Sequence, residues 1–137
     1  MMTENKFSVH VSYDVVLTEE NIDDIVCTAL EGGITYWCSR CEVIGESLGE
    51  WAHEQIARGG MLKLYIDEEV DGDTKWWLNR EKFLAGFNAW IENGDDLYGA
   101  VSKVGVDTCQ IDACMADSII QYALFGEVVF GGEEDDT

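Results

Sequence analysis

Four of the five cysteines in the chain stand in two close pairs that suggest a metal site. Cys38 and Cys41 have the two-residue spacing of a zinc knuckle, and Cys109 and Cys114 are separated by four residues. Four thiolates brought together could bind zinc tetrahedrally. The second pair is spaced too widely for a standard knuckle, and cysteine is also a common small core residue. We therefore predict no metal site and no cofactor.

The other motifs that could support catalysis are incomplete. Asp67 and Asp71 lie in a stretch with a faint likeness to a calcium loop, but its twelfth position, where a bidentate Glu belongs, is Leu78. His53 is followed by Glu54, and no second histidine completes a zinc-protease motif. Neither a phosphate-binding loop nor a nucleophile elbow occurs. We therefore predict that the protein is not an enzyme, and we assign no catalytic residue.

A group of aromatic and basic residues could instead bind a small nucleotide. Tyr36 and Trp37 precede Arg40, and Arg58 follows in the next segment. Aromatic rings stack on bases and cations meet phosphates, so these four are candidate ligand-binding residues. The other interpretation, which we favour, is that most of the aromatics fill the core. Tyr36 and Trp37 would then seal the core beside the preceding helix.

Acidity is the strongest global feature of the chain. Its 28 acidic and 8 basic residues give a formal net charge of −20, and no Lys or Arg follows Val104. Such a chain repels nucleic acid and anionic membranes and attracts basic surfaces; the alternative is that its acidity only aids solubility. Two groups of acids are the candidate partner-binding residues: Glu19, Glu20, Asp23, Asp24 and Glu31 (the first-helix acids), and Asp67, Glu68, Glu69, Asp71 and Asp73 (the hairpin-tip acids).

The length of 137 residues suits a single domain with one core, which we assign to residues 1–131. Residues 132–137 are predicted to form a short disordered acidic tail. The first residues lack the pattern of a signal peptide, and no segment has the length and hydrophobicity of a membrane span. Together with the odd number of cysteines, this favours a reducing, cytoplasmic setting.

In the first part of the chain, some segments have a clear secondary-structure pattern and others are ambiguous. Apolar residues recur at every second position between Lys6 and Val16, which predicts a strand. An amphipathic helix follows, with Thr18 as its N-cap and the Gly32–Gly33 pair at its end. Residues 34–45 fit either a helical turn or a short strand. Residues 47–60 read as a short helix that carries Leu48, Trp51, Ala52 and Ile56 on one side.

The remainder predicts a hairpin and two helices. Residues 61–79 form the hairpin, turning at VDGD, with Trp76 and Trp77 on opposite faces of the returning strand. Helices are expected from the N-cap Asn79 to Asn93–Gly94 and over residues 112–126. The stretch between them fits a loop, either alone or with a short edge strand. The stretch EVVFG reads as a closing strand. The predicted fold class is α+β: an antiparallel sheet or hairpin with three to four helices packed on it.

Three stretches carry a resemblance: TALEGGITYWC, FLAGFNAWIENG and ADSIIQYALFGEVVFG. They resemble an uncharacterised family of small acidic proteins encoded by phages and prophages of gut bacteria, and the resemblance spans Thr18 to Gly131. It implies the cytoplasm of a bacterial host during infection, and no catalytic residues carry over from it.

Charge and context together predict a phage-encoded inhibitor of a bacterial defence system, anti-CRISPR-like or anti-restriction. Its acidic surface would mimic nucleic acid and bind a basic channel of a host defence effector. We expect no direct nucleic acid binding and no membrane association. Two alternatives stay open: a protein that sequesters a cyclic-nucleotide-type defence signal, and a phage accessory or assembly protein, with a homo-oligomer hiding Trp77 and Phe130.

Overall fold

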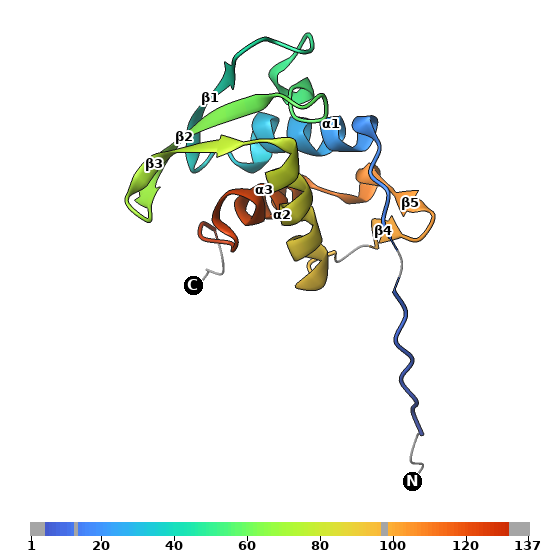
Figure 1. Cartoon of the computed structure of the whole chain (residues 1–137). Helices are drawn as coiled ribbons and strands as arrows, with labels where there is room; N and C mark the ends of the chain where they lie inside the picture. The colour runs from blue at the N-terminus through green and yellow to red at the C-terminus, as the bar shows by residue number, and fades with distance from the viewer. Residues whose placement is uncertain (1–4, 13, 97–98, 132–137) are drawn as a thin grey trace.

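A three-stranded antiparallel sheet with helices on one face forms the body of the protein (Figure 1). The structure is a computed structural model that describes residues 5–12, 14–96 and 99–131, so the predicted tail lies outside the described residues. The sheet has the order β1 (Cys38–Ile44), β2 (Met61–Val70), β3 (Asp73–Leu78). The helices are α1 (Glu19–Thr28), α2 (Arg80–Glu92) and α3 (Ala113–Phe125). The predicted α+β class is confirmed.

Local capping sets where the helices begin. Thr18 and Asn21 form a capping box on α1, in which each side chain bonds the other's backbone N–H at 3.0 Å. Asn79 accepts from the N–H of Lys82 at 2.9 Å and caps α2 as predicted. Asp112 caps α3, which ends at Gly126 with a φ of 78°.

The glycine pair after α1 does more than stop a helix. The chain continues from α1 as a π-helix over Ala29–Gly33. A Cβ added at Gly33 would lie 2.6 Å from the carbonyl oxygen of Ala113. Gly33 therefore allows the beginning of α3 to pack directly against the end of the first helical segment.

The β2–β3 hairpin supplies the sheet side of the core, as predicted. Leu62, Leu64 and Ile66 of β2 are buried, and Leu78 of β3 is buried beside them. Phe83, Phe87 and Trp90 of α2 and the apolar face of α3 pack beneath the sheet. Trp77 points the other way and is 41 % exposed.

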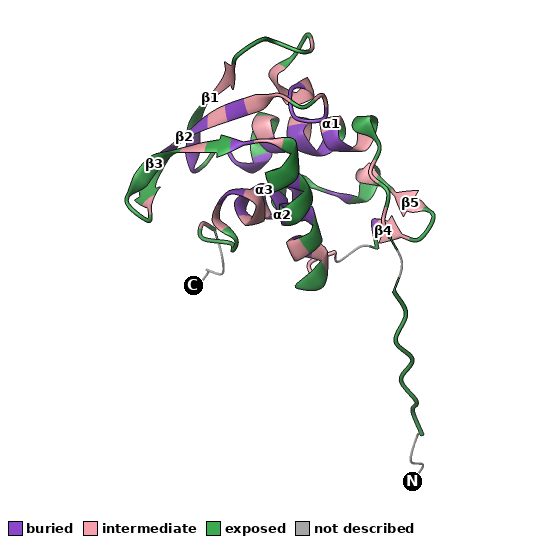
Figure 2. Ribbon diagram, viewed as in Figure 1, coloured by how far each residue is buried: buried purple, intermediate pink, exposed green. Residues whose placement is uncertain are grey.

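Three sequence-based expectations about secondary structure are corrected. The predicted strand from Lys6 to Val16 is wrong: its described residues are extended but pair with no strand, and residues 5–12 run away from the body as an arm (Figures 1 and 2). Alternation alone cannot form a strand, because a strand needs a partner for its backbone. The stretch EVVFG is also not a strand, since Gln121 Oε1 takes the N–H groups of Val129 and Phe130 at 2.7 and 2.8 Å.

The predicted helix over residues 47–60 shrinks to one turn of 3-10 helix, Ala52–Glu54, and Leu48 and Trp51 are exposed. The Glu54 carboxylate bonds the N–H groups of Glu50 and Trp51, which fixes a turn in place of a longer helix. The ambiguous segment 34–45 contains β1. A two-stranded hairpin, β4 (Val101–Ser102) and β5 (Gly105–Val106), lies in the predicted loop. Among the described residues, no helix is long and apolar enough to cross a bilayer.

Candidate functional site

The hairpin-tip acids lie at the end of β2 and β3, where the hairpin extends past the helices (Figure 1). All five residues are exposed. The turn is tight because Asp71 and Gly72 both take left-handed backbone conformations, with φ of 51° and 83°. None of the five carboxylates forms an ion pair with a residue that the structure describes. The tip is therefore a compact, uncompensated negative surface.

The first-helix acids are partly compensated by their surroundings. Arg58 lies 3.4 Å from Glu19 and 3.5 Å from Asp23. Burial raises the pKa of the Asp23 carboxyl, and the Arg58 guanidinium opposes that rise. Asp24 accepts a 2.9 Å hydrogen bond from the Thr108 hydroxyl. Three of these five acids are thus engaged with neighbouring residues, and the hairpin tip is the better candidate for contact with a partner.

Tyr36 and Trp37 meet on one carboxylate. The Tyr36 hydroxyl donates to Asp117 Oδ2 at 2.6 Å, and Trp37 Nε1 donates to Asp117 Oδ1 at 2.7 Å. Gln121 Nε2 also donates to Asp117 Oδ1, at 2.8 Å. Trp37 is 2 % exposed and stacks on Phe130 with ring centroids 5.3 Å apart. Trp37 therefore helps close the core as expected, whereas Tyr36 is 54 % exposed and lies at its border. Both residues contact Phe130 and so hold the C-terminal segment against α3.

Burial changes the chemistry of this network. It raises the pKa of the Asp117 carboxyl, and the three hydrogen bonds that the carboxyl accepts act against that rise. Burial and the bond to Asp117 also raise the pKa of Tyr36. The Tyr36 hydroxyl therefore stays protonated as a donor at physiological pH. Among the residues that the structure describes, Asp117 is the only buried carboxylate, and its contacts are structural.

The four candidate ligand-binding residues do not line one pocket. Trp37 is in the core, Tyr36 borders a hollow beside α3, and Arg40 borders a different hollow at the edge of β1. Arg58 is engaged with Glu19 and Asp23. The nucleotide pocket expected from their closeness in sequence is therefore not assembled from these residues.

The cysteines are all free, and the two pairs differ in their environment. Cys38 is buried and Cys41 half-buried in β1, whereas Cys109 and Cys114 are exposed near the start of α3. Burial raises the pKa of Cys41 to about 12, so its thiol is protonated and unreactive at neutral pH. No group of three or more His, Cys, Asp or Glu residues among those described is placed to hold a metal ion.

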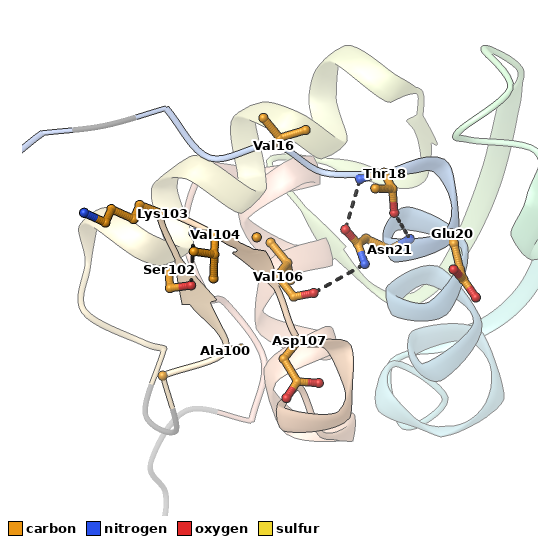
Figure 3. Close-up of a pocket in the computed structure, with 12 residues that line it drawn as sticks. Val16, Thr18, Glu20, Asn21, Ala100, Ser102, Lys103, Val104, Val106 and Asp107 are labelled. Atoms are coloured by element: carbon orange, nitrogen blue, oxygen red, sulfur yellow. Dashed lines mark hydrogen bonds between the residues drawn. The ribbon is translucent and has the colours of Figure 1, made fainter.

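A polar hollow of about 570 Å³ lies between the start of α1 and the β4–β5 hairpin (Figure 3). Asn21 spans it by donating to the Val106 carbonyl at 3.5 Å while completing the capping box with Thr18. Glu20 and Asp107 lie at its border with a single cation, Lys103. Since Asn21 joins Thr18 to Val106 across it, we interpret the hollow as the junction between these two elements.

One arrangement was missed from the sequence: the outer face of the sheet, turned away from the helices. Strand register places Arg40 opposite Tyr65 and Tyr65 opposite Lys75. The next row is Glu42, Lys63 and Trp77. We call these six residues the outer face. The sequence alone shows that Lys63 and Tyr65 lie on the same face of one strand. The pairing register was needed to show which residues of the other two strands lie beside them.

The chain was compared with protein-family models, curated proteins and solved structures, and nothing matches it.

Proposed function

We propose that the protein is a phage-encoded, non-catalytic inhibitor of a bacterial defence system that binds a basic, nucleic-acid-binding surface of a host protein. The observation that carries this proposal is the hairpin tip: five exposed carboxylates on a projecting turn, without ion-pair partners among the described residues. Carboxylates placed on a rigid support can occupy the sites at which a basic channel holds phosphates. The resemblance to phage and prophage proteins supplies the cellular context.

Expression in bacteria that carry a CRISPR or restriction system tests the proposal. A sensitive phage should plate with higher efficiency on cells that express the protein. Neutralising the tip with Asp67→Asn, Glu68→Gln, Glu69→Gln, Asp71→Asn and Asp73→Asn should abolish that protection. Asn suits position 71 because it tolerates the left-handed conformation that Asp71 adopts.

A matched control separates placement of charge from net charge. Five exposed acids elsewhere can be neutralised in the same way: Asp14, Glu46, Glu50, Glu81 and Glu92. Both variants carry a formal net charge of −15, since each removes five from −20. The control should protect as well as the natural chain. Equal loss of protection in the two variants, or no protection by the natural chain in any defended strain, would overturn the proposal.

A second candidate, an accessory protein that assembles with itself, is favoured by the arm formed by residues 5–12. Phe7, Val9 and Val11 share one side of this extended segment and are 89 %, 82 % and 70 % exposed. An apolar groove of about 660 Å³ lies at its root, bordered by Leu84 and Phe87 of α2. The arm contains no acid, so it suits the acidic body of a second copy.

Light scattering coupled to gel filtration tests this candidate. The natural chain should be a dimer, with each arm seated in the groove of the other copy. Val9→Asp places a charge on the apolar side of the arm and should give a monomer. Ser8→Asp adds the same charge on the opposite side and should leave the dimer intact. A natural chain that is monomeric at high concentration would exclude arm exchange.

A further inference from the structure

The outer face gathers cations and aromatic rings on an otherwise acidic molecule. Three of the eight basic residues of the chain, Arg40, Lys63 and Lys75, occupy half of its six positions. Its one acid, Glu42, is engaged: it accepts a 2.7 Å hydrogen bond from the Tyr65 hydroxyl and lies 3.6 Å from Arg40. If the charged residues served only solubility, we would not expect three of the eight basic residues to lie together on one face.

Aromatic rings orient two of these three cations, Arg40 and Lys63. The Arg40 guanidinium lies over the Tyr65 ring, 4.6 Å from its centroid. The Lys63 ammonium is 5.1 Å from the Tyr65 centroid and 5.3 Å from that of Trp77. Such cation–π contacts orient a side chain without neutralising it. The charge of Lys63 therefore remains available to an anion above the sheet, whereas Arg40 shares its charge with Glu42.

The exposed ring of Trp77 adds a surface on which a base could stack. Its ring is 41 % exposed although it sits on a strand of the central sheet. At its base, Lys82 Nζ donates to the Trp77 carbonyl oxygen at 2.8 Å, which places a fourth cation beside the outer face. An exposed ring flanked by cations can stack on a nucleobase while the cations meet the adjoining phosphates.

We propose that the outer face is a binding site for single-stranded nucleic acid. A polymer fits better than a free nucleotide, because small ligands favour concave sites of roughly 300–1,000 Å³. The hollow beside Arg40 at the edge of β1 has only about 130 Å³, and the other hollows described above lie elsewhere. A duplex fits poorly, because its stacked bases are not open to a ring on a sheet. This site lies on different residues from the hairpin tip and does not depend on the proposed function.

This inference revises our expectation of no direct nucleic acid binding, which rested on net charge. At physiological salt the Debye length is about 8 Å, so a phosphate at the outer face responds mainly to the nearest charges. The acids of the tip still limit the site, because Asp67 follows Tyr65 two residues along the same strand. We therefore expect a short footprint of roughly four nucleotides, running across the strands and away from the tip.

Fluorescence anisotropy with labelled dT10 and rU10 tests the site. Trp77→Ala should weaken binding about tenfold, and Trp77→Phe should restore most of it, since a ring is kept. Trp51→Ala is the matched control, because Trp51 is 60 % exposed but lies off the sheet, and it should bind as the natural chain does. Lys75→Ala should lower the slope of log K against log salt by about 0.7, whereas Lys103→Ala should leave it unchanged.

Several outcomes would overturn the proposal. These are no binding of either oligonucleotide at low salt, equal losses for the two Trp→Ala variants, and an AMP affinity as high as that of dT10. Competition by poly-glutamate with no effect of Trp77→Ala would assign the face to an acidic peptide instead. The tip-neutralised variant should still bind dT10, so failure of this site and failure of the proposed function are distinguishable.

Discussion

The hydroxyl of Tyr36 donates a 2.6 Å hydrogen bond to the carboxylate of Asp117, 81 residues further along the chain. Trp37, the next residue, bonds the other oxygen of the same carboxylate. Tyr36 and Trp37, which follow the first helical segment, thus bond the two oxygens of one carboxylate on α3. This relationship explains why the glycine pair is followed by two large aromatics, and it makes Asp117 a focus for tests of stability.

Asp117→Asn should make stability less dependent on pH. Because folding raises the pKa of this carboxyl, its contribution favours the folded state below the unfolded pKa of about 3.9 and is lost as pH rises through the folded pKa. An Asn Oδ1 can accept the bonds from Trp37 and Gln121, and its Nδ2 can donate to Tyr36. Urea unfolding of both proteins over a series of pH values should show the difference between them shifting in favour of Asn as pH rises. A constant difference would contradict this.

Asp117→Leu should be more damaging than Asp117→Asn at every pH. It leaves the indole N–H of Trp37 and one N–H of the Gln121 amide without an acceptor, at a cost of about 1–3 kcal/mol for each unpaired donor. Gln121 Nε2 keeps its 3.1 Å bond to the Phe130 carbonyl oxygen. The free energy of unfolding from urea titrations measures the loss. Equal stability of the two variants would show that the network contributes only packing.

Trp37→Ala should reduce the free energy of unfolding by about 3–5 kcal/mol, as expected for a large ring removed from a core. Trp37 packs on Phe125 and Phe130, with centroid distances of 5.7 and 5.3 Å. Trp51→Ala removes the same side chain from an exposed position and should change stability by less than about 0.5 kcal/mol. Unchanged stability of Trp37→Ala, measured in urea, would contradict the core position of this ring.

Gly86→Ala should destabilise the protein by about 1–3 kcal/mol. Helices α2 and α3 meet at this glycine, where an added Cβ would lie 2.5 Å from the backbone nitrogen of Ala123. Gly32→Ala is the matched control, because a Cβ added at Gly32 would meet no atom within 4 Å. Ala also favours helical backbone, so the free energy of unfolding should stay the same or rise by up to about 1 kcal/mol. Thermal unfolding distinguishes the two. A harmless Gly86→Ala would mean that the helices can separate at little cost.

Thiol reactivity should distinguish the two cysteine pairs. In the folded protein, Cys109 and Cys114 should react quickly with Ellman's reagent because both are exposed. Cys38 and Cys41 should react only in urea, since burial raises the pKa of each thiol. Treatment with EDTA should change neither the thiol count nor the melting temperature. An increase in fast-reacting thiols after EDTA would instead indicate a bound metal.

Local chemistry made much of the fold predictable. The caps Thr18 and Asn79 and the VDGD turn act through hydrogen bonds and backbone angles within a few residues, so their sequence signals are sufficient. The period of the apolar residues likewise predicted both long helices. The same reasoning failed for the arm and for the segment around Trp51. Whether an extended segment becomes a strand depends on a distant partner, and a short helix competes with side-chain bonds such as those of Glu54.

The candidate sites likewise divide into features that the sequence predicted and features that only the tertiary structure revealed. Composition and turn position were enough to identify the hairpin-tip acids, because a tight turn exposes its residues wherever the hairpin packs. Only the tertiary structure assigned Arg58 to Glu19 and Asp23, or Tyr36 and Trp37 to Asp117. The outer face also required it, since strand register brings together residues from three segments. Such pairings depend on the packing of the whole chain, and neighbours in sequence do not encode them.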